Sequence, residues 1–414
     1  MRSTYIITPL KATSQFNIKE LNIKDAKELG FDSESMSDLI RHKCAMDQGF
    51  VRRFSLKRED ISVDFSDGFS MPVKDIQLSV FENGIGLLSV LFIINEEEID
   101  RIYDFINPGY LDDKDKELQQ YFINDIRNKV LSGTGFDIDV EGDDKKLAIK
   151  ESYLFNAAFT DCRYKELEQI DKATFNVHKL IKVDEEFDDR SERDIAYTYG
   201  ARDVENKTYR WGACISSQSI SFVYGPSNSN YDFKNKIAYE SSKDFSVEDM
   251  SLLMEDDLLL TILALHQRFT CADFSERVFN GIYNEGIGNI KKLKEEMLEF
   301  KAFGTITPFQ VSRWHNVCET YRYLLKMNGV GEALVDIGEK INLLDEEMEQ
   351  NTNRKRNIFA TIIAIFGLTS IIASVQQITD YIMQGDPTIE MWTGISVGGL
   401  VLLGIAFIIA LRRK

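Results

Sequence analysis

The spacing of apolar and polar residues changes twice along the chain and divides it into three regions. Up to about residue 242, short apolar runs with strand-like or helical spacing follow one another. Two such runs, within 75–95, flank Asn83-Gly84, a dipeptide that suits the positive φ angles of a tight hairpin turn. Beyond about residue 245 only helical spacing is found, and from residue 358 the apolar runs become long. The pattern predicts an α+β chain whose N-terminal α/β domain spans 1–244.

The elements of this first domain follow from the local spacing. Strand-like runs predict a strand at 154–159 and two or three strands within 197–224. Helical spacing predicts helices at 96–106, 115–131 and 164–181. These patterns predict the class of the domain, and they leave the order of its strands open.

The region 245–352 is expected to form a helical layer and one long stalk helix. Helices are predicted at 247–269, 289–300 and 308–327. The last of these is expected to start at Thr307-Pro308, because proline fits the first turn of a helix.

Two glycines, Gly329 and Gly331, interrupt the helical pattern before the stalk helix and are the predicted hinge, because glycine accepts backbone angles that other residues resist. From Glu332 no helix breaker occurs up to the long apolar run. One continuous helix at 332–379 would be about 70 Å long at about 1.5 Å per residue. Its apolar side chains repeat at alternating intervals of three and four residues, as in a supercoiled seam: Leu334, Ile337, Ile341, Leu344 and Met348.

Two apolar segments predict membrane spans at 358–379 and 391–411, within a two-span domain at 353–414. Each is long enough to cross a hydrocarbon core of about 30 Å. Basic triplets at 354–356 and 412–414 stand at the outer ends, and the short turn between the spans carries acidic residues and no Lys or Arg. By the positive-inside rule, both termini are expected to be cytoplasmic, in a multi-pass protein of the cell inner membrane. No signal-peptide pattern opens the sequence, so insertion is expected to rely on these spans.

One face of the first span is small or polar, whereas the other faces carry large apolar side chains. In lipid, small residues let helices approach closely, and hydroxyl or amide groups need partners or water. A ring of such helices would enclose a narrow, wetted conduit; a packing seam in a dimer or bundle is the alternative. Many carboxylates lie on the stalk helix at 336–349. They either concentrate cations near a pore or simply form a solvent-exposed face of the helix. The predicted pore-lining residues are Asn353, Arg356, Ala360, Ile363, Gly367, Ser370, Ser374, Gln377, Asp380 and Tyr381.

Composition narrows the classes of function. The net charge of −18 argues against a general nucleic-acid binder, because a phosphate backbone would be repelled. The five cysteines and four histidines do not stand at metal-ligand spacing, so no metal site is predicted, and a reducing compartment is expected. His266, in a leucine-rich segment, is expected to be a core histidine. No catalytic constellation appears, so the chain is not expected to be an enzyme or to need a cofactor.

Positive charge gathers in one segment against this acidic background. Arginine grips phosphate with paired hydrogen bonds, and Phe50 and Phe54 stand nearby to stack on a base. The segment is therefore a candidate binding edge for an anionic nucleotide; the alternative is a subunit contact or a surface that balances the acidic face. The candidate ligand-binding residues are Arg41, Lys43, Arg52, Arg53, Lys57 and Arg58.

The arrangement of a cytoplasmic α/β domain, a helical layer, one long helix entering the membrane and a second short span resembles the CorA family of magnesium channels. The resemblance covers 245–414 and includes the run Leu-Ala-Leu-His-Gln-Arg at 263–268 and the basic tail at 412–414. It implies a homopentamer whose first span lines the pore. In the family a Gly-Met-Asn triplet at the outer end of that span selects hydrated divalent cations. Here the corresponding stretch, 376–385, lacks the triplet, so magnesium selectivity is not carried over.

Divergent CorA-like proteins with enlarged N-terminal domains also look like the membrane effectors of type III CRISPR systems. Those effectors respond to a nucleotide messenger, an S-adenosylmethionine–AMP conjugate. The resemblance implies a ligand-gated channel that serves antiviral defence, with the lipid bilayer and a small anionic nucleotide as partners and no direct nucleic acid. A divalent-cation transporter with an unconventional filter and a non-conducting, membrane-anchored binding protein are the alternatives.

Overall fold

The computed structural model describes residues 1–382 except for several gaps, which are 13–16, 22, 24–25, 31–32, 34, 46, 57–59, 108–110, 139–151, 187–193, 201, 203–206, 227–246 and 284–287. The predicted second span at 391–411 lies outside the described residues. The chain divides into two compact units, Met1–Lys340 and Ile341–Lys414. The predicted domain boundary at 244/245 falls inside the first unit.

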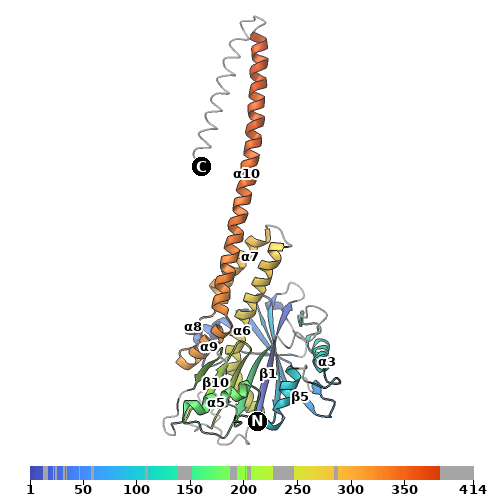
Figure 1. Cartoon of the computed structure of the whole chain (residues 1–414), viewed down its shortest axis with the longest axis vertical. Helices are drawn as coiled ribbons and strands as arrows, with labels where there is room; N and C mark the ends of the chain where they lie inside the picture. Colours follow the sequence, from blue (N-terminus) through green and yellow to red (C-terminus); the bar gives the residue numbers. More distant parts are fainter. Residues whose placement is uncertain are drawn as a thin grey trace. The chain divides into compact units, whose positions relative to one another are not determined.

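The first unit is built on one mixed β-sheet, which confirms the α+β class. Its described strands number eleven, in the order β2-β3-β5-β6-β1-β8-β11-β10-β9, with β4 beside β5 and β7 beside β1 (Figure 1). Strands β8 and β11 pair in parallel, and the other described pairs are antiparallel. The strands are β1 (Arg2–Ala12), β2 (Lys27–Leu29), β3 (Val51–Ser55), β4 (Ser62–Asp64), β5 (Ser70–Phe81), β6 (Ile85–Ile94), β7 (Phe136–Ile138), β8 (Tyr153–Phe159), β9 (Ala196–Tyr199), β10 (Trp211–Ile215) and β11 (Ser219–Tyr224).

The hairpin predicted at 75–95 is confirmed as β5 and β6, and Gly84 takes the positive φ of +88° that the turn requires. The predicted strand at 154–159 is β8, and the region 197–224 forms the three strands β9, β10 and β11.

The sequence patterns missed β1, a central strand of the sheet. Tyr5 and Ile7 pack into the core on one face of β1, and Ile6 and Leu10 pack into the core on the other. Because helices cover both faces of the sheet at this strand, its sequence does not alternate between apolar and polar residues.

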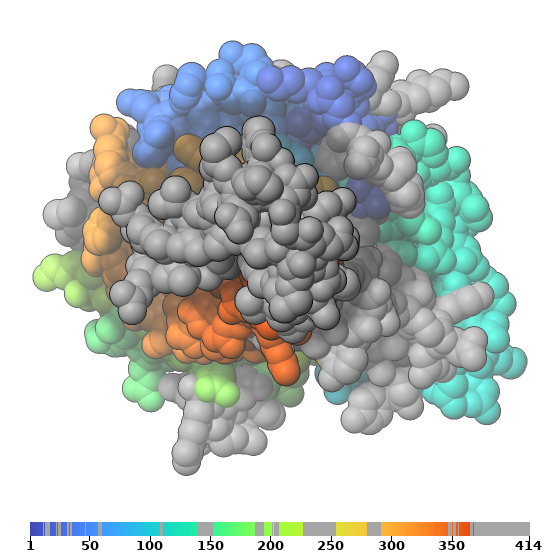
Figure 2. All heavy atoms as spheres, turned by 90° about the horizontal axis from the view of Figure 1, so that it is seen from above, coloured from blue at the N-terminus to red at the C-terminus, as the bar shows by residue number. Residues whose placement is uncertain are grey.

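Helices cover both faces of the sheet. One face packs against α6 (Val247–Tyr283) and α9 (His315–Met327) in a single hydrophobic core. The opposite face is covered by α2 (Ile99–Ile106), α3 (Leu118–Asp125) and α5 (Leu167–His178). The helices predicted at 96–106, 115–131 and 164–181 correspond to α2, α3 and α5, except that a 3-10 turn (Glu96–Glu98) precedes α2 and a π-helical segment (Ile126–Leu131) continues α3. Helix α6 starts at the predicted residue but runs to Tyr283, past the predicted end at 269. In the view from above, α3 and α8 lie on opposite sides of this unit (Figure 2).

The helix predicted at 289–300 is confirmed as α7 (Gly288–Glu299), followed by a π-helical turn (Phe300–Gly304). The single helix predicted at 308–327 is wrong, because the chain forms α8 (Pro308–Val311) and then α9. Ser312 between them is extended, with φ −153° and ψ 159°, and its hydroxyl accepts a hydrogen bond from the amide of Trp314 at 3.1 Å. The predicted start is confirmed: Thr307 forms a capping box with Gln310, and Pro308 occupies the first turn.

The long helix is α10, which runs from Val330 to Ile382 over 53 residues without a break. It begins two residues before the predicted start at Glu332. Val330 and Ile337 are buried in the first unit. The side chains of residues 368–382 lie outside what the structure describes.

Candidate functional site

The basic segment folds into α1 (Asp38–Lys43) and β3, joined by a turn. Ser37 caps α1: its hydroxyl accepts a hydrogen bond from the amide of Ile40 at 3.2 Å. Four of the six candidate ligand-binding residues lie on these two elements, and Lys57 and Arg58 lie outside the described residues.

Arg52 ties three segments of the protein together. Its Nε and Nη2 atoms donate to the two carboxylate oxygens of Glu28 on β2, at 2.7 and 2.8 Å. Its Nη1 atom donates to the carbonyls of Ile18 and Leu21, at 3.0 and 2.5 Å. The hydrogen bond from Arg52 lowers the pKa of the Glu28 carboxyl. The guanidinium therefore uses its planar donor fork on the protein itself.

Arg53, the next residue of β3, points to the opposite face of the sheet and is 2% exposed. It donates to Gln77 of β5 at 2.9 Å and lies 3.7 Å from a carboxylate oxygen of Glu255 on α6. Burial lowers the pKa of Arg53, and the charge of Glu255 opposes that shift. Arg53 therefore joins the sheet to α6 by an ion pair in which the arginine is buried and the Glu255 side chain is 31% exposed.

The two cations of α1 have partners close by. Arg41 forms an ion pair with Asp38 of the same helix. Lys43 lies over the ring of Phe50, 4.3 Å from its centroid, and donates to the carbonyl of Phe303. Burial lowers the pKa of the Lys43 ammonium.

The structure thus does not bring the four described cations of the basic segment to one point. Arg52 and Arg53 face opposite sides of β3, and each has carboxylate and carbonyl or amide partners within the chain. These contacts agree with the alternative interpretation, in which the segment balances acidic groups. Binding of an anionic nucleotide here stays a prediction.

The prediction that His266 is a core histidine is confirmed. It is 1% exposed on α6, and burial lowers its pKa to about 3. Its Nε2 atom lies 3.2 Å from the side-chain oxygen of Asn83, in the turn of the β5–β6 hairpin. Asn83 also donates to the hydroxyl of Thr270, one helical turn further along α6, at 2.8 Å. The hairpin tip is thereby attached to α6, a contact that sequence spacing does not reveal because the partners are 183 residues apart.

The two predicted hinge glycines occupy different backbone conformations. Gly329, between α9 and α10, has a φ of +63°, in the left-handed region. Gly331 lies in the first turn of α10. A Cβ atom on either residue would meet nothing within 4 Å.

All ten predicted pore-lining residues lie within α10, and the side chains of five are described: Asn353, Arg356, Ala360, Ile363 and Gly367. On this part of the helix four large apolar side chains are exposed: Ile358, Phe359, Ile362 and Ile363.

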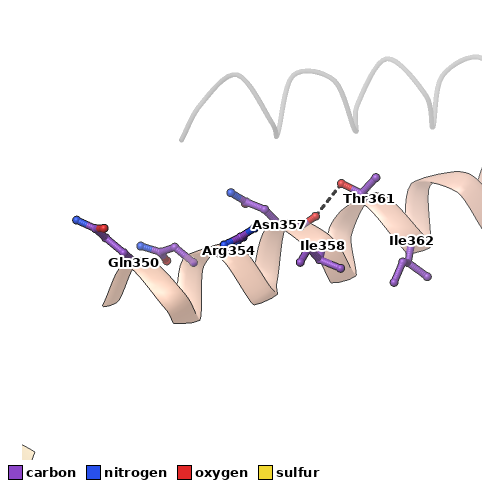
Figure 3. A pocket seen from close by; sticks show the side chains of 7 residues that line it. Gln350, Arg354, Asn357, Ile358, Thr361 and Ile362 are labelled. Carbon is purple, nitrogen blue, oxygen red and sulfur yellow. Dashed lines mark hydrogen bonds between the residues drawn. The ribbon is translucent and has the colours of Figure 1, made fainter. Parts of the chain in front are cut away.

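A shallow pocket follows one side of α10 in the second unit (Figure 3). Polar side chains succeed one another along it, and the hydroxyl of Thr361 donates to the carbonyl of Asn357 at 2.8 Å. Asn353 is the one residue shared by this pocket and the predicted pore face. The lining residues are Gln350, Asn353, Arg354, Asn357, Ile358, Thr361 and Ile362.

Over the part of the chain that the structure describes, no helix combines the length and the apolar character that a membrane crossing needs. Within the same residues, no three His, Cys, Asp or Glu side chains gather where they could hold a metal ion. No protein-family model, curated protein or solved structure matches the chain.

Proposed function

We propose that this chain is a homo-oligomeric, CorA-like membrane ion channel that serves antiviral defence. A nucleotide messenger of the S-adenosylmethionine–AMP type gates the channel through its N-terminal domain. The observation that carries the proposal is α10. This single helix begins at the Gly329 turn and continues without a break to Ile382, through the whole of the predicted first span at 358–379.

The surface of α10 supports the membrane part of the proposal. Ile358, Phe359 and Ile362 expose large apolar side chains immediately after the basic triplet at 354–356. Runs of exposed apolar side chains of this size are typical of surfaces covered by lipid or by other helices. Cationic residues at the start of such a run favour the cytoplasmic side of a bilayer.

The base of α10 supports the gating part. Val330 and Ile337 are buried in the first unit, so the helix is anchored where it begins. A Cβ atom added to Gly338 would lie 2.9 Å from Lys301 Nζ and 3.0 Å from Met297 Cε, so the helix passes close to α7 and the π-helical turn after it. A change in the packing of the helical layer would therefore move the base of α10 directly.

A divalent-cation transporter is the second candidate, favoured by the exposed carboxylates of Glu332, Asp336 and Glu339 on α10. Carboxylates near a conduction path raise the local concentration of cations. Asp336 is in an ion pair with Lys340, which reduces its share of that effect.

The test is ion flux from proteoliposomes that contain the full chain, loaded with a magnesium dye and a sodium dye, with and without an S-adenosylmethionine–AMP conjugate. Flux of both ions only with the messenger is the expected result. Messenger-independent flux confined to divalent ions would favour the transporter. Absence of flux under all conditions would contradict both and leave a membrane-anchored binding protein.

A further inference from the structure

Two exposed surfaces of the first unit have opposite chemical character. The first, the aromatic–basic patch, consists of Leu39, Arg41, Phe303, Phe309 and Arg313. Phe309 is 82% exposed and Phe303 is 68% exposed, which is unusual for phenylalanine in a folded unit.

Helix α1 holds the parts of this patch together. Lys43 at its end donates to the carbonyl of Phe303. Ser37 at its start donates through its backbone amide to the carbonyl of Val311 at 2.8 Å. Leu39, on the same helix, is 53% exposed between these two attachments. The three elements that carry Phe303, Phe309 and Leu39 are therefore attached to one another, and each exposes its large apolar side chain.

Two arginines lie beside the apolar side chains of the patch, and one of them, Arg41, is paired with the exposed Asp38. Arg41 is partly exposed on α1, and Arg313 is exposed and lies over the ring of Trp314, 5.1 Å from its centroid. The surface combines large aromatic groups with arginine, a composition enriched at the centres of protein interfaces.

The second surface, the acidic strip, lies on the first turns of α10 and consists of Glu332, Val335, Asp336 and Glu339. All four residues are exposed, and Val335 is 59% exposed. Positions three, four and seven apart share a face of an α-helix, so the four side chains form one strip. Ile337, on the other side of the helix, is buried in the same unit.

We propose that the aromatic–basic patch of one copy of this chain binds the acidic strip of α10 of a second copy. The chain carries a net charge of −18, so two copies repel each other except where opposite charges face. The patch supplies arginines and exposed phenylalanines, and the strip supplies carboxylates around an exposed valine. Charge and apolar character therefore match between the two surfaces.

The contact is head-to-tail, because each copy uses a different surface on its two sides. Repetition of such a contact closes into a ring when the rotation between copies allows it. The inference rests on the proposed function only in requiring several copies of the chain in one assembly, and it does not depend on conduction.

The test is cross-linking in membranes between two forms of the full chain, each of which carries one introduced cysteine at the surface and keeps the four buried cysteines Cys44, Cys214, Cys271 and Cys318. Cys162 is the exposed cysteine among the described residues, so Cys162→Ser gives the background. Phe309→Cys and Val335→Cys are made separately on it, expressed alone or together, and treated with a flexible bismaleimide. The expected result is a cross-linked dimer when both forms are expressed together and a several-fold weaker band, or none, with either form alone.

Charge reversal tests the same contact. Arg41→Glu with Arg313→Glu should reduce the cross-link several-fold, and so should Glu332→Lys with Glu339→Lys. All four changes together should restore it, because opposite charges face again. Tyr121→Ser is the matched control, since Tyr121 is 61% exposed on α3, on the far side of the unit from α8, and should leave the cross-link unchanged.

Three outcomes would overturn the proposal: no cross-link in the mixture, an equally strong band with one form alone, or no restoration by the fourfold charge reversal. An oligomer that persists by mass without the cross-link would reject this contact and leave the proposed channel intact. A chain that is monomeric by mass would reject both. Capture by liposomes of anionic lipid, lost in Phe303→Ser with Phe309→Ser, would assign the patch to a membrane surface instead.

Discussion

The imidazole of His266 on α6 lies flat against the ring of Phe81 at the end of β5, with 3.8 Å between the ring centroids and 10° between the planes. The rings of Phe50 and Phe300 meet the same imidazole edge-on, at 5.7 and 5.9 Å. Phe81 and Phe50 belong to the sheet region, whereas Phe300 follows α7. One neutral histidine thus joins the sheet to the helical layer.

This contact predicts a dependence of stability on pH. Burial lowers the pKa of His266 to about 3, from an ordinary value of 6.5. Between these values the unfolded chain binds a proton that the folded chain excludes, so the free energy of unfolding falls as the pH drops below about 6.5. The expected slope for this group is about 1.4 kcal/mol per pH unit, and above about pH 6.5 its contribution is constant. His266→Leu should remove that part of the slope, as measured by urea unfolding between about pH 7 and about pH 5.5.

The matched control is His315→Leu, because the side chain of His315 is 83% exposed on α9. Loss of an exposed histidine should leave the slope close to that of the unchanged protein. If His266→Leu and the unchanged protein show the same slope, the imidazole is protonated in the folded state and its assigned surroundings are wrong.

Substitution of Arg52 and of Arg53, neighbours in β3, should lower the free energy of unfolding by different amounts. Arg53→Leu removes the buried guanidinium that contacts Gln77 and Glu255, and the free energy of unfolding should fall by about 3 kcal/mol, the lower end for a broken buried pair because the Glu255 side chain is 31% exposed. Arg53→Leu with Glu255→Leu should recover most of that loss, because neither charge remains. Arg52→Leu removes charged hydrogen bonds from a more exposed site and should cost about 1–3 kcal/mol. Urea unfolding measures all three, and an equal cost for Arg52→Leu and Arg53→Leu would contradict the difference in burial.

The local elements of this fold follow from sequence where a periodic pattern is complete. The β5–β6 hairpin was predictable because Asn83-Gly84 marks the turn and apolar runs flank it. Strand β1 was not, because its two buried faces erase the alternation on which a strand assignment rests. The break between α8 and α9 was not predicted either. Ser312 is extended there, and its hydroxyl accepts the hydrogen bond of the Trp314 amide.

The candidate ligand-binding residues show a second reason why sequence alone does not predict a site. Arginines that are close in the sequence can form one binding site only if their side chains lie on the same face of the strand or helix. Arg52 and Arg53 are adjacent in a strand, so their side chains point to opposite faces. Glu28 and Glu255, their carboxylate partners, lie far away in the sequence and could not be identified from it.

Alanine at the two predicted hinge glycines, Gly329 and Gly331, should change the free energy of unfolding in opposite directions. Gly329→Ala forces a Cβ atom into the left-handed region at φ +63°, and the free energy of unfolding should fall by about 1–2 kcal/mol. Gly331→Ala lies within α10 with open space around it and should raise the free energy of unfolding by about 0.5–1 kcal/mol. Thermal unfolding of the two variants in the same detergent measures both. A loss of stability in Gly331→Ala would show that its backbone is not helical in the assembled protein.

The same pair tests gating. If the turn at Gly329 lets α10 move, Gly329→Ala should change the fraction of open channels in proteoliposomes at unchanged oligomeric mass, and Gly331→Ala should change it less. Equal effects of the two substitutions on opening would place the pivot elsewhere on the chain.

The predicted pore face is tested by substitutions that keep the first span apolar. Ser374→Leu and Gln377→Leu each replace a small or polar side chain of that face by a bulky apolar one, which should block hydration of a narrow conduit and strongly reduce ion flux. Ile372→Leu, on an opposite face by helical spacing, is the matched control and should conduct normally. All three variants keep or increase apolar character, so insertion should be equal and is checked by the amount of protein in the membrane fraction. A conducting protein that is indifferent to both Ser374→Leu and Gln377→Leu would show that this face packs against other helices, and a loss of flux in Ile372→Leu alone would move the conduit to the opposite side of α10.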